Sequence, residues 1–232
     1  MCGRLNVSDD PAVRALCEML DINIWSEPPI FTRYIGAASP VSIIRETTQG
    51  RSLDDAIWWL LLETSETGFR PSKYTSFNTR YDKLNTPRSA GYTPYRESRC
   101  VIPAKGFGES EFNNKRRIHC HDLEAIDEAI AFGGLYKEWI NPTTGEATFS
   151  CSVITLPPHP KFANIHSKSI PLMLPQEGDW LDAWLDPSIT DTRRFDGLLQ
   201  SKLRHNLKVQ QIAKPSAYHQ AIGDAFVIEK DI

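Results

Sequence analysis

The sequence predicts an α+β fold, a single domain over residues 1–232 whose core is a mostly antiparallel, barrel-like β-sheet flanked by helices. Short segments rich in β-branched and aromatic residues fill the middle of the chain, whereas helical spacing of apolar residues is confined to its two ends. Hydrophobic residues make up 41% of the 232 residues, enough for one sizeable core. The sequence shows no repeat, low-complexity tract or linker that would divide it.

The N-terminal part predicts one helix, an irregular segment and a strand. Asp10 and Pro11 form a helix start, and apolar residues recur at helical spacing up to Leu20, so we expect a helix over residues 11–21. Three prolines and one glycine between positions 25 and 40 favour an extended or looped chain. Residues 41–44 then form a short apolar strand.

The rest of the chain predicts a long connection, several strands and two helices. Ser, Thr, Asn and Pro are dense over residues 68–94, which favours an irregular connection of the kind that often carries function. Strands are expected over residues 100–103, 118–120, 129–136 and 148–156. Apolar residues at helical spacing predict helices over residues 179–185 and 191–203, packed on that sheet.

The charge balance argues against a protein that coats duplex DNA by charge alone. The net charge is −3, whereas such proteins are usually strongly basic. Residues 80–120 nevertheless contain nine basic and four acidic side chains, a local balance of +5. For the three consecutive basic residues at 115–117, a solvated charged surface is the favoured interpretation.

The five cysteines indicate reduced thiols. They stand at positions 2, 17, 100, 120 and 151 without a C-x-x-C pair, so neither a disulfide framework nor a zinc ribbon is predicted. Cys17 and Cys151 lie in apolar patterns where cysteine behaves as a small buried hydrophobe. With no apolar run of membrane-spanning length and no secretory signal, we expect a cytoplasmic protein, a monomer, without cofactor or metal.

Cys2 differs from the other cysteines because it follows the initiator methionine. Aminopeptidases remove Met1 before a small residue, and Cys2 would then carry an α-amine of pKa about 7.7 to 8.0 beside a thiol of pKa about 8.5. An α-amine condenses with an aldehyde to an imine, and the neighbouring thiolate closes a five-membered thiazolidine. The alternative is that a cysteine stands at this position by chance.

Four short motifs carry a resemblance to a known family. Met1-Cys2-Gly3-Arg4, Asn78-Thr79-Arg80, Gly106-Phe107-Gly108-Glu109, and His166 followed by Pro171-Leu172 resemble, in this order, the motifs of the SOS-response-associated peptidase (SRAP) family. The resemblance spans roughly residues 1–175. It implies an abasic-site processing activity of peptidase or lyase-like type, in which the N-terminal cysteine crosslinks to abasic sites in single-stranded DNA. It also implies that Cys2 is the nucleophile, with Asn78, Glu109 and His166 in its pocket.

Each implied role suits the chemistry of the residue. A carboxyl at Glu109, after two glycines and a phenylalanine, can be desolvated until its pKa approaches neutrality, and it can then both donate and accept the protons of imine formation. His166 can protonate the sugar ring oxygen or the thiazolidine. The Asn78 amide can orient the amine or a sugar hydroxyl.

The expected DNA contacts combine cations and rings. The planar guanidinium groups of Arg4 and Arg80 suit phosphates. Lys168 stands where the family has a basic residue. Aromatic rings stack on bases without sequence preference, although tryptophans in an apolar run are more often part of the core. The residues expected on the DNA-facing wall are Pro40, Trp58, Trp59, Tyr74 and Phe77.

The chain departs from the family pattern at several positions. After Arg33-Tyr34 the asparagine of an Asn-x-Ala-Pro-like segment is absent, and the chain reaches Pro40 without it. The Trp-Gly-x-x-Pro motif is replaced by Trp58-Trp59-Leu60-Leu61-Leu62, and Ser110 stands where a tryptophan is expected. The spacing from His166 to Pro171 is one residue longer. These changes indicate a divergent member.

Three other interpretations stay open at the level of sequence. Cys2 and His166 could form a thiol-peptidase pair that acts on the chain's own leader. The basic segment could bind single-stranded DNA without covalent chemistry. His119 and His121 lie on one face of a predicted strand, as metal ligands would, but no third and fourth ligand is evident.

Overall fold

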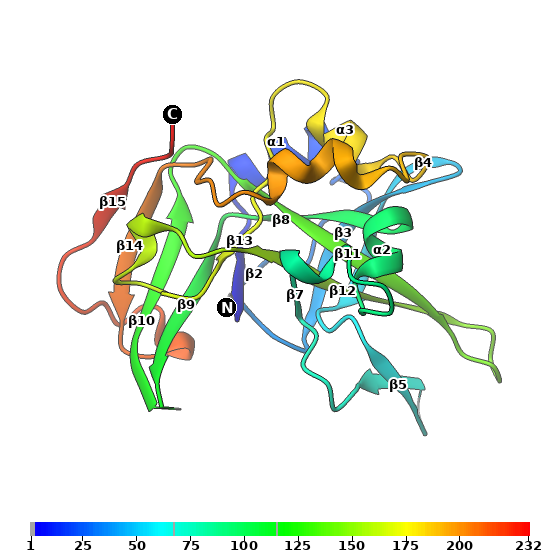
Figure 1. Cartoon of the computed structure of the whole chain (residues 1–232), viewed down its shortest axis with the longest axis horizontal. Coiled ribbons are helices and arrows are strands. Elements are labelled where there is room, and N and C mark those ends of the chain that lie inside the picture. The colour runs from blue at the N-terminus through cyan, green and yellow to red at the C-terminus, as the bar shows by residue number, and fades with distance from the viewer. Residues whose placement is uncertain (1–2, 67, 115) are drawn as a thin grey trace.

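A computed structural model describes residues 3–66, 68–114 and 116–232 of the chain, so Met1, Cys2, Thr67 and Lys115 lie outside the described residues. Its strands form a closed barrel with two attached strands, an open six-stranded sheet, and a two-stranded sheet of β5 (Leu62–Ser65) and β6 (Gly68–Pro71). In Figure 1 the open sheet lies on the left and the barrel on the right.

Five strands close the barrel: β3 (Pro40–Thr47), β4 (Gly50–Ile57), β8 (Arg99–Ala104), β11 (Ile130–Ile140) and β12 (Ala147–Leu156). β11 pairs with both β8 and β12, which completes the ring. Only the β4–β12 pair of this ring is parallel. Closure removes exposed strand edges. The prediction of a mostly antiparallel, barrel-like sheet is therefore confirmed.

Two short strands extend the barrel on the side of β12. β7 (Asn78–Arg80) pairs with it in parallel, and β13 (Ile170–Pro171) pairs with it antiparallel. The segment 68–94, expected to be irregular, therefore contains β6, β7, the 3₁₀ turn Tyr81–Lys83 and the start of α2 (Tyr92–Glu97). These elements are too short to produce a periodic pattern in the sequence.

The open sheet is antiparallel throughout. Its order is β15 (Phe226–Ile228), β14 (Leu207–Ile212), β10 (Arg116–Ala125), β9 (Gly106–Asn113), β1 (Arg4–Val7) and β2 (Thr32–Gly36). β1 is short and pairs with β9 only from Arg4 to Asn6. The part of β9 beyond Gly108 therefore has no partner on the β1 side within the described residues.

Two of the three α-helices that the described residues form cover one end of the molecule, and α2 lies at the right in Figure 1. In α1 (Pro11–Met19) the Asp10 side chain accepts the N–H of Ala12, which confirms the expected helix start. α3 (Trp180–Leu185) lies near α1 above the sheets in Figure 1. Residues Thr192–Leu199 form a 3₁₀ helix rather than the expected α-helix, and Gly197 within it has low helix propensity. The remaining 3₁₀ turns are Pro160–Phe162 and Pro215–Ala217.

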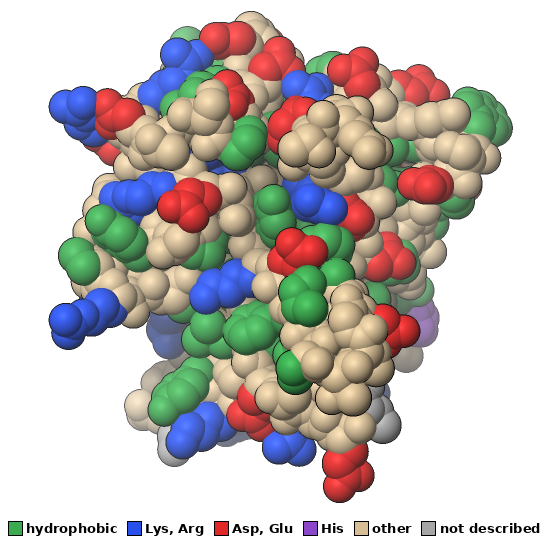
Figure 2. All heavy atoms as spheres, turned by 90° about the vertical axis from the view of Figure 1, so that its right-hand side faces the viewer, with side chains coloured by type: hydrophobic (Ala, Val, Ile, Leu, Met, Phe, Trp, Pro, Cys, Tyr) green, Lys and Arg blue, Asp and Glu red, His purple; other side chains and the backbone are tan. Residues whose placement is uncertain are grey.

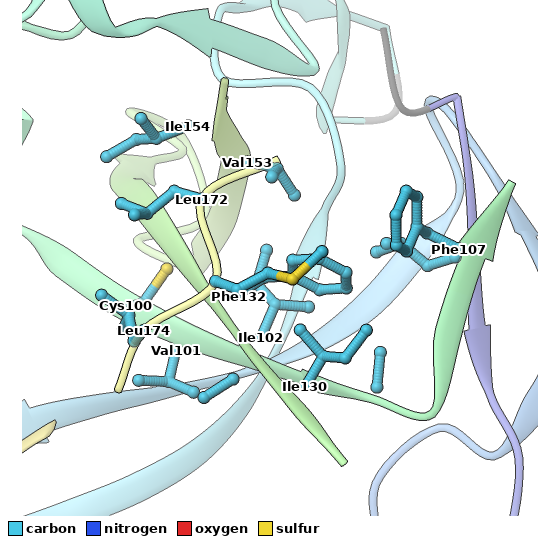
Figure 3. Packing of buried hydrophobic residues seen from close by; sticks show 14 of the residues in the cluster. Cys100, Val101, Ile102, Phe107, Ile130, Phe132, Val153, Ile154, Leu172 and Leu174 are labelled. Atoms are coloured by element: carbon cyan, nitrogen blue, oxygen red, sulfur yellow. The ribbon is translucent and has the colours of Figure 1, made fainter. Parts of the chain in front are cut away.

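One hydrophobic core joins the barrel to the open sheet. Phe107 of β9 lies 5.7 Å from Phe132 of β11, ring centroid to ring centroid, in an edge-on arrangement, and stacks on Phe162 at 6.4 Å. Figure 3 shows Phe107 on its own strand, beside the cluster that contains Phe132, Ile102 and Ile130. This packing fixes the strand that continues from Phe107 into the site described below.

The four described cysteines form no disulfide. Cys17, Cys100, Cys120 and Cys151 are free and buried. Burial raises the pKa of the Cys17 thiol to about 11, and it raises the pKa values of Cys100 and Cys151 well above the ordinary range. Separately, no helix within the described ranges has the length and apolar character needed to cross a membrane.

Candidate functional site

A pocket of about 310 Å³ opens beside the N-terminal end of β1. Gly3, which follows Cys2 in the sequence, lines this pocket and donates its N–H to the Gly108 carbonyl at 3.4 Å. The other described lining residues come from β1, β9, β10, β14 and three loops: Arg4, Phe77, Gly108, Glu109, Ser110, Phe112, Arg117, Cys120, His121, His166, Lys168, Ile212 and Pro215.

Packing explains the residue types of the Gly106-Phe107-Gly108-Glu109 motif. A side chain at Gly106 would overlap the backbone carbonyl of Leu123 on β10, and one at Gly108 would overlap the Arg4 guanidinium. Phe107 lies in the core. Side chains alternate along a strand, so Glu109 shares the face of Phe107 and follows it toward the pocket. The glycines hold three strands close, and the motif buries one carboxyl at their junction.

Burial determines the acid strength of Glu109. The side chain is 1% exposed, and this burial raises its pKa to about 7. The nearby charge of Glu111 shifts the pKa in the same direction. At neutral pH the carboxyl is therefore divided between its two protonation states, which is what a group needs to serve as both acid and base.

His166 lies next to Glu109. It follows the turn Pro160–Phe162, and its backbone N–H donates to Phe162. Its Nδ1 is 3.8 Å from Glu109 Oε2, 3.1 Å from Glu111 Oε2 and 3.2 Å from the Ser110 carbonyl oxygen. A carbonyl only accepts, so Nδ1 carries the proton of the neutral ring and Nε2 is the basic nitrogen.

Burial of His166 outweighs its acidic neighbours. It lowers the pKa of the imidazole to about 4, although Glu111 acts in the opposite direction. Burial raises the pKa of Glu111, but hydrogen bonds from the N–H and hydroxyl of Ser167 prevail and hold it below its ordinary value. At neutral pH the site therefore contains a neutral imidazole, an ionised Glu111 and a half-protonated Glu109.

Of the four residues assigned to chemistry, two line the pocket. Glu109 and His166 do so, and Cys2 lies outside the described residues. Asn78 stands on β7 opposite Val153, directly after Phe77, which lines the pocket. The motifs quoted above thus bring Glu109, His166 and the neighbour of Cys2 together from three separate parts of the chain.

The expected DNA-contacting rings divide into exposed and buried ones. Trp58 is completely buried and donates its indole N–H to the Phe77 carbonyl at 2.8 Å, so its expected stacking role is corrected to a core role. Trp59 is half-buried against Phe77, with ring centroids 5.7 Å apart. Tyr74 is 63% exposed, and Pro40 is exposed at the start of β3.

The expected cations also divide. Arg4 is buried, pairs with Asp122, which also pairs with Arg33, and lines the pocket, so its contact with a DNA phosphate stays a prediction. Arg80 is exposed and pairs with Asp82 at 2.7 Å. Lys168 is exposed and lines both this pocket and a neighbouring one, of about 440 Å³, that Arg80 also lines.

Two residues of the site were not predicted as part of it: Glu111 was not considered, and His121 was considered only as a metal ligand. Glu111 contacts His166, and its position two residues after Glu109 on the same strand was the available signal. His121 lies directly opposite Glu109 in the β9–β10 pair, and that register cannot be read from the sequence. His119 and His121 pack edge to face at 4.9 Å, and the described residues contain no group of three or more ligands arranged for a metal.

A family model and two curated relatives match this chain. The model of the SOS response associated peptidase (SRAP) family matches residues 1–215. The curated relatives include the abasic site processing protein YoqW of Bacillus subtilis (strain 168), 29% identical over 141 residues, which are 60% of this chain and 61% of that protein. Abasic site processing protein YobE of the same organism is 28% identical over 141 residues, 62% of its length. The matched segment thus spans about three fifths of these relatives.

Solved structures share the fold. A protein from Bacteroides thetaiotaomicron superposes with a TM-score of 0.71 at 19% identity, covering 95% of this chain and 100% of that one. A protein from Bordetella bronchiseptica gives a TM-score of 0.66 at 18% identity, covering 92% and 100%. At these identities the similarity concerns the arrangement of the strands and helices alone.

Proposed function

The chain belongs to the SOS response associated peptidase (SRAP) family, and we propose that it processes abasic sites in single-stranded DNA by forming a covalent bond through Cys2. The observation that carries the proposal is the position of Gly3. The residue that adjoins Cys2 lines the same pocket as Glu109 and His166. The names of the relatives, abasic site processing proteins, supply the substrate.

The chemistry requires loss of Met1, which leaves an amine and a thiol on Cys2. The ring-opened sugar of an abasic site presents an aldehyde. The amine adds to this aldehyde, the neutral form of Glu109 protonates the hydroxyl of the carbinolamine, and water leaves as the imine forms. The thiol then adds across the imine carbon and nitrogen to give a thiazolidine, and no further atoms are lost.

A carboxyl of pKa about 7 suits both proton transfers of this sequence. Its ionised form removes the proton that the amine acquires on addition, and its neutral form protonates the departing hydroxyl. His166, neutral and with Nε2 as its basic nitrogen, can take the hydroxyl proton of the closed sugar as the ring opens. Reversal through the same groups would release the DNA.

The DNA strand is proposed to run past Lys168 and Arg80. These two exposed cations line adjoining pockets and would position the phosphates beside the lesion. Figure 2 shows the barrel side of the molecule, where lysine and arginine are interspersed with aspartate and glutamate. Because the net charge of the chain is −3, local cations rather than overall charge would guide the strand. A cytoplasmic location and a monomeric state stay predictions.

Incubation with a single-stranded abasic oligonucleotide, followed by denaturing electrophoresis, tests the proposal. We expect a shifted band that survives denaturation for the wild-type protein and for Cys17→Ala, because Cys17 is buried in α1 and does not line the pocket. Cys2→Ala should give none. A band retained by Cys2→Ala would refute the proposal, and binding without any covalent band would indicate a non-covalent single-strand binder.

The removal of Met1 is tested separately. Protein expressed without host methionine aminopeptidase is analysed by intact mass. If the chain removes its own Met1, the mass lacks one methionine, and His166→Ala should retain it. If wild type retains Met1 there, the peptidase part of the proposal is wrong and the host enzyme performs the removal.

A further inference from the structure

His121 is placed within the pocket but has no role in the chemistry described above. It lies on β10 directly opposite Glu109 on β9 and is 6% exposed. Partners in an antiparallel pair share one face of the sheet, with Cβ atoms roughly 4.5 to 5.5 Å apart. His121 therefore faces the same space as the carboxyl that handles the aldehyde, and it lines the same pocket.

One nitrogen of this imidazole lacks a protein partner. His121 Nδ1 is buried and has no hydrogen-bond partner among the described residues, and the imidazole packs edge-on against the His119 ring. Buried polar atoms in native proteins are nearly always hydrogen-bonded. A buried ring nitrogen beside a pocket therefore indicates a polar group of the ligand.

Burial keeps the His121 imidazole neutral near pH 7. Burial and the adjacent His119 lower the pKa of the imidazole to about 4. Among the described residues, the titratable and charged groups that line the same pocket are Glu109 of β9, Arg117 of β10, Arg4 of β1, and His166 and Lys168 of the loop before β13. β14 places the uncharged Gln211 opposite His121. A neutral imidazole carries one donor and one acceptor, which matches a hydroxyl rather than a phosphate.

Resting on the proposed function, we propose that His121 binds a hydroxyl of the ring-opened sugar and so makes the pocket select hydroxy-aldehydes over plain alkyl aldehydes. In the open sugar of an abasic site, the carbon that bears the free hydroxyl lies three bonds from the aldehyde carbon. The adjacent positions of Glu109 and His121 across the strand pair match these two groups, with the aldehyde at Glu109 and the hydroxyl at His121.

The test compares two single-stranded oligonucleotides of the same sequence. One carries an abasic site, and the other carries a saturated alkyl aldehyde without a hydroxyl at that position. Rate constants of covalent band formation are measured for both, and their ratio is compared between proteins, which cancels the intrinsic reactivity of each aldehyde. The proteins are wild type, His121→Phe, His121→Gln, and the matched control His119→Phe on the same strand.

We expect His121→Phe to lower the ratio of abasic to alkyl rate constants roughly three- to tenfold, the loss of one hydrogen bond. His121→Gln, which keeps a donor and an acceptor, should retain part of the preference. His119→Phe should keep the wild-type ratio. An unchanged ratio in His121→Phe, or equal slowing of both substrates, would overturn the inference and leave the proposed function standing. If wild type crosslinks to neither oligonucleotide, the proposed function itself fails.

Discussion

The closed barrel and the open sheet bury different kinds of polar group. In the barrel, the buried polar side chains are mainly hydroxyls, such as Ser150, which donates to the Leu60 carbonyl, and Ser152, which pairs with Thr79. Arg99 of β8 is the ionisable exception there, and its guanidinium donates to backbone carbonyls. In the open sheet and the loop beside it, the buried polar groups are mainly ionisable: Arg4, Glu109, His121, Asp122 and His166.

This difference locates the chemistry. Burying ionisable groups costs free energy, and a protein retains such groups where they are used. Phe107 of β9 packs against Phe132 in the barrel core, and this contact holds β9 in place. Within the part of the chain that the structure describes, β1 pairs with β9 only as far as Gly108, and Glu109 follows directly. The barrel supports the site, and the open sheet forms it.

The sharpest test of this division compares one residue from each region. Glu109→Gln removes the proton-transfer group and should slow crosslinking to an abasic oligonucleotide by about 10²-fold or more. Ile102→Val in the barrel core should cost about 1 kcal/mol of stability and leave the rate within about twofold. Rate constants come from timed denaturing gels. Equal slowing by both variants would show that the regions are not separable.

Although Glu109→Gln should slow crosslinking, it should make the folded protein more stable. The pKa of Glu109 rises from 4.5 to about 7 on folding, so the folded state binds more protons between these values and loses stability as pH rises through them. Glu109→Gln should therefore raise the free energy of unfolding at pH 8 by about 2 to 3 kcal/mol, and the gain should vanish below about pH 4.5. Urea unfolding at both pH values measures it. A variant that is less stable at pH 8 would contradict the account.

Two glycines give a matched pair. A side chain at Gly108 would overlap Arg4, and one at Gly133 in the barrel would overlap Leu172. Each alanine variant should cost about 1 to 3 kcal/mol of stability. Only Gly108→Ala should also slow crosslinking at a temperature where both stay folded, because it displaces the strand that follows Gly3. Thermal unfolding and gel assays together check this, and a slowed Gly133→Ala would argue against it.

The smallest expected effect concerns acid stability. The pKa of His121 is lowered to about 4 on folding, so the unfolded chain binds more protons than the folded chain below about pH 6.5. The free energy of unfolding therefore decreases as the pH is lowered below this value. His121→Gln should reduce this loss by about 1 kcal/mol between pH 7 and pH 5. Denaturant midpoints at the two pH values provide the measurement. An unchanged pH dependence would mean that His121 is not buried as a neutral ring.

The fold class and part of the site could be predicted from the sequence. Strand composition indicated the barrel, and the cap at Asp10 indicated α1. The motifs brought Glu109 and His166 into one hypothesis, and the structure places them 3.8 Å apart. The sequence could not show that Trp58 is buried or that Arg4 pairs with Asp122, because burial and long-range pairing depend on strand register. For the same reason the sequence could not show that His121 lies opposite Glu109.

The most direct test of the central claim is the site of the covalent bond. Protein crosslinked to an abasic oligonucleotide is digested with protease and nuclease, and the modified peptide is sequenced by mass spectrometry. We predict that the modification lies on Cys2, in a peptide that lacks Met1 and carries the sugar fragment less one water. A modification on Cys120 or on a lysine, or a crosslinked peptide that retains Met1, would contradict the account.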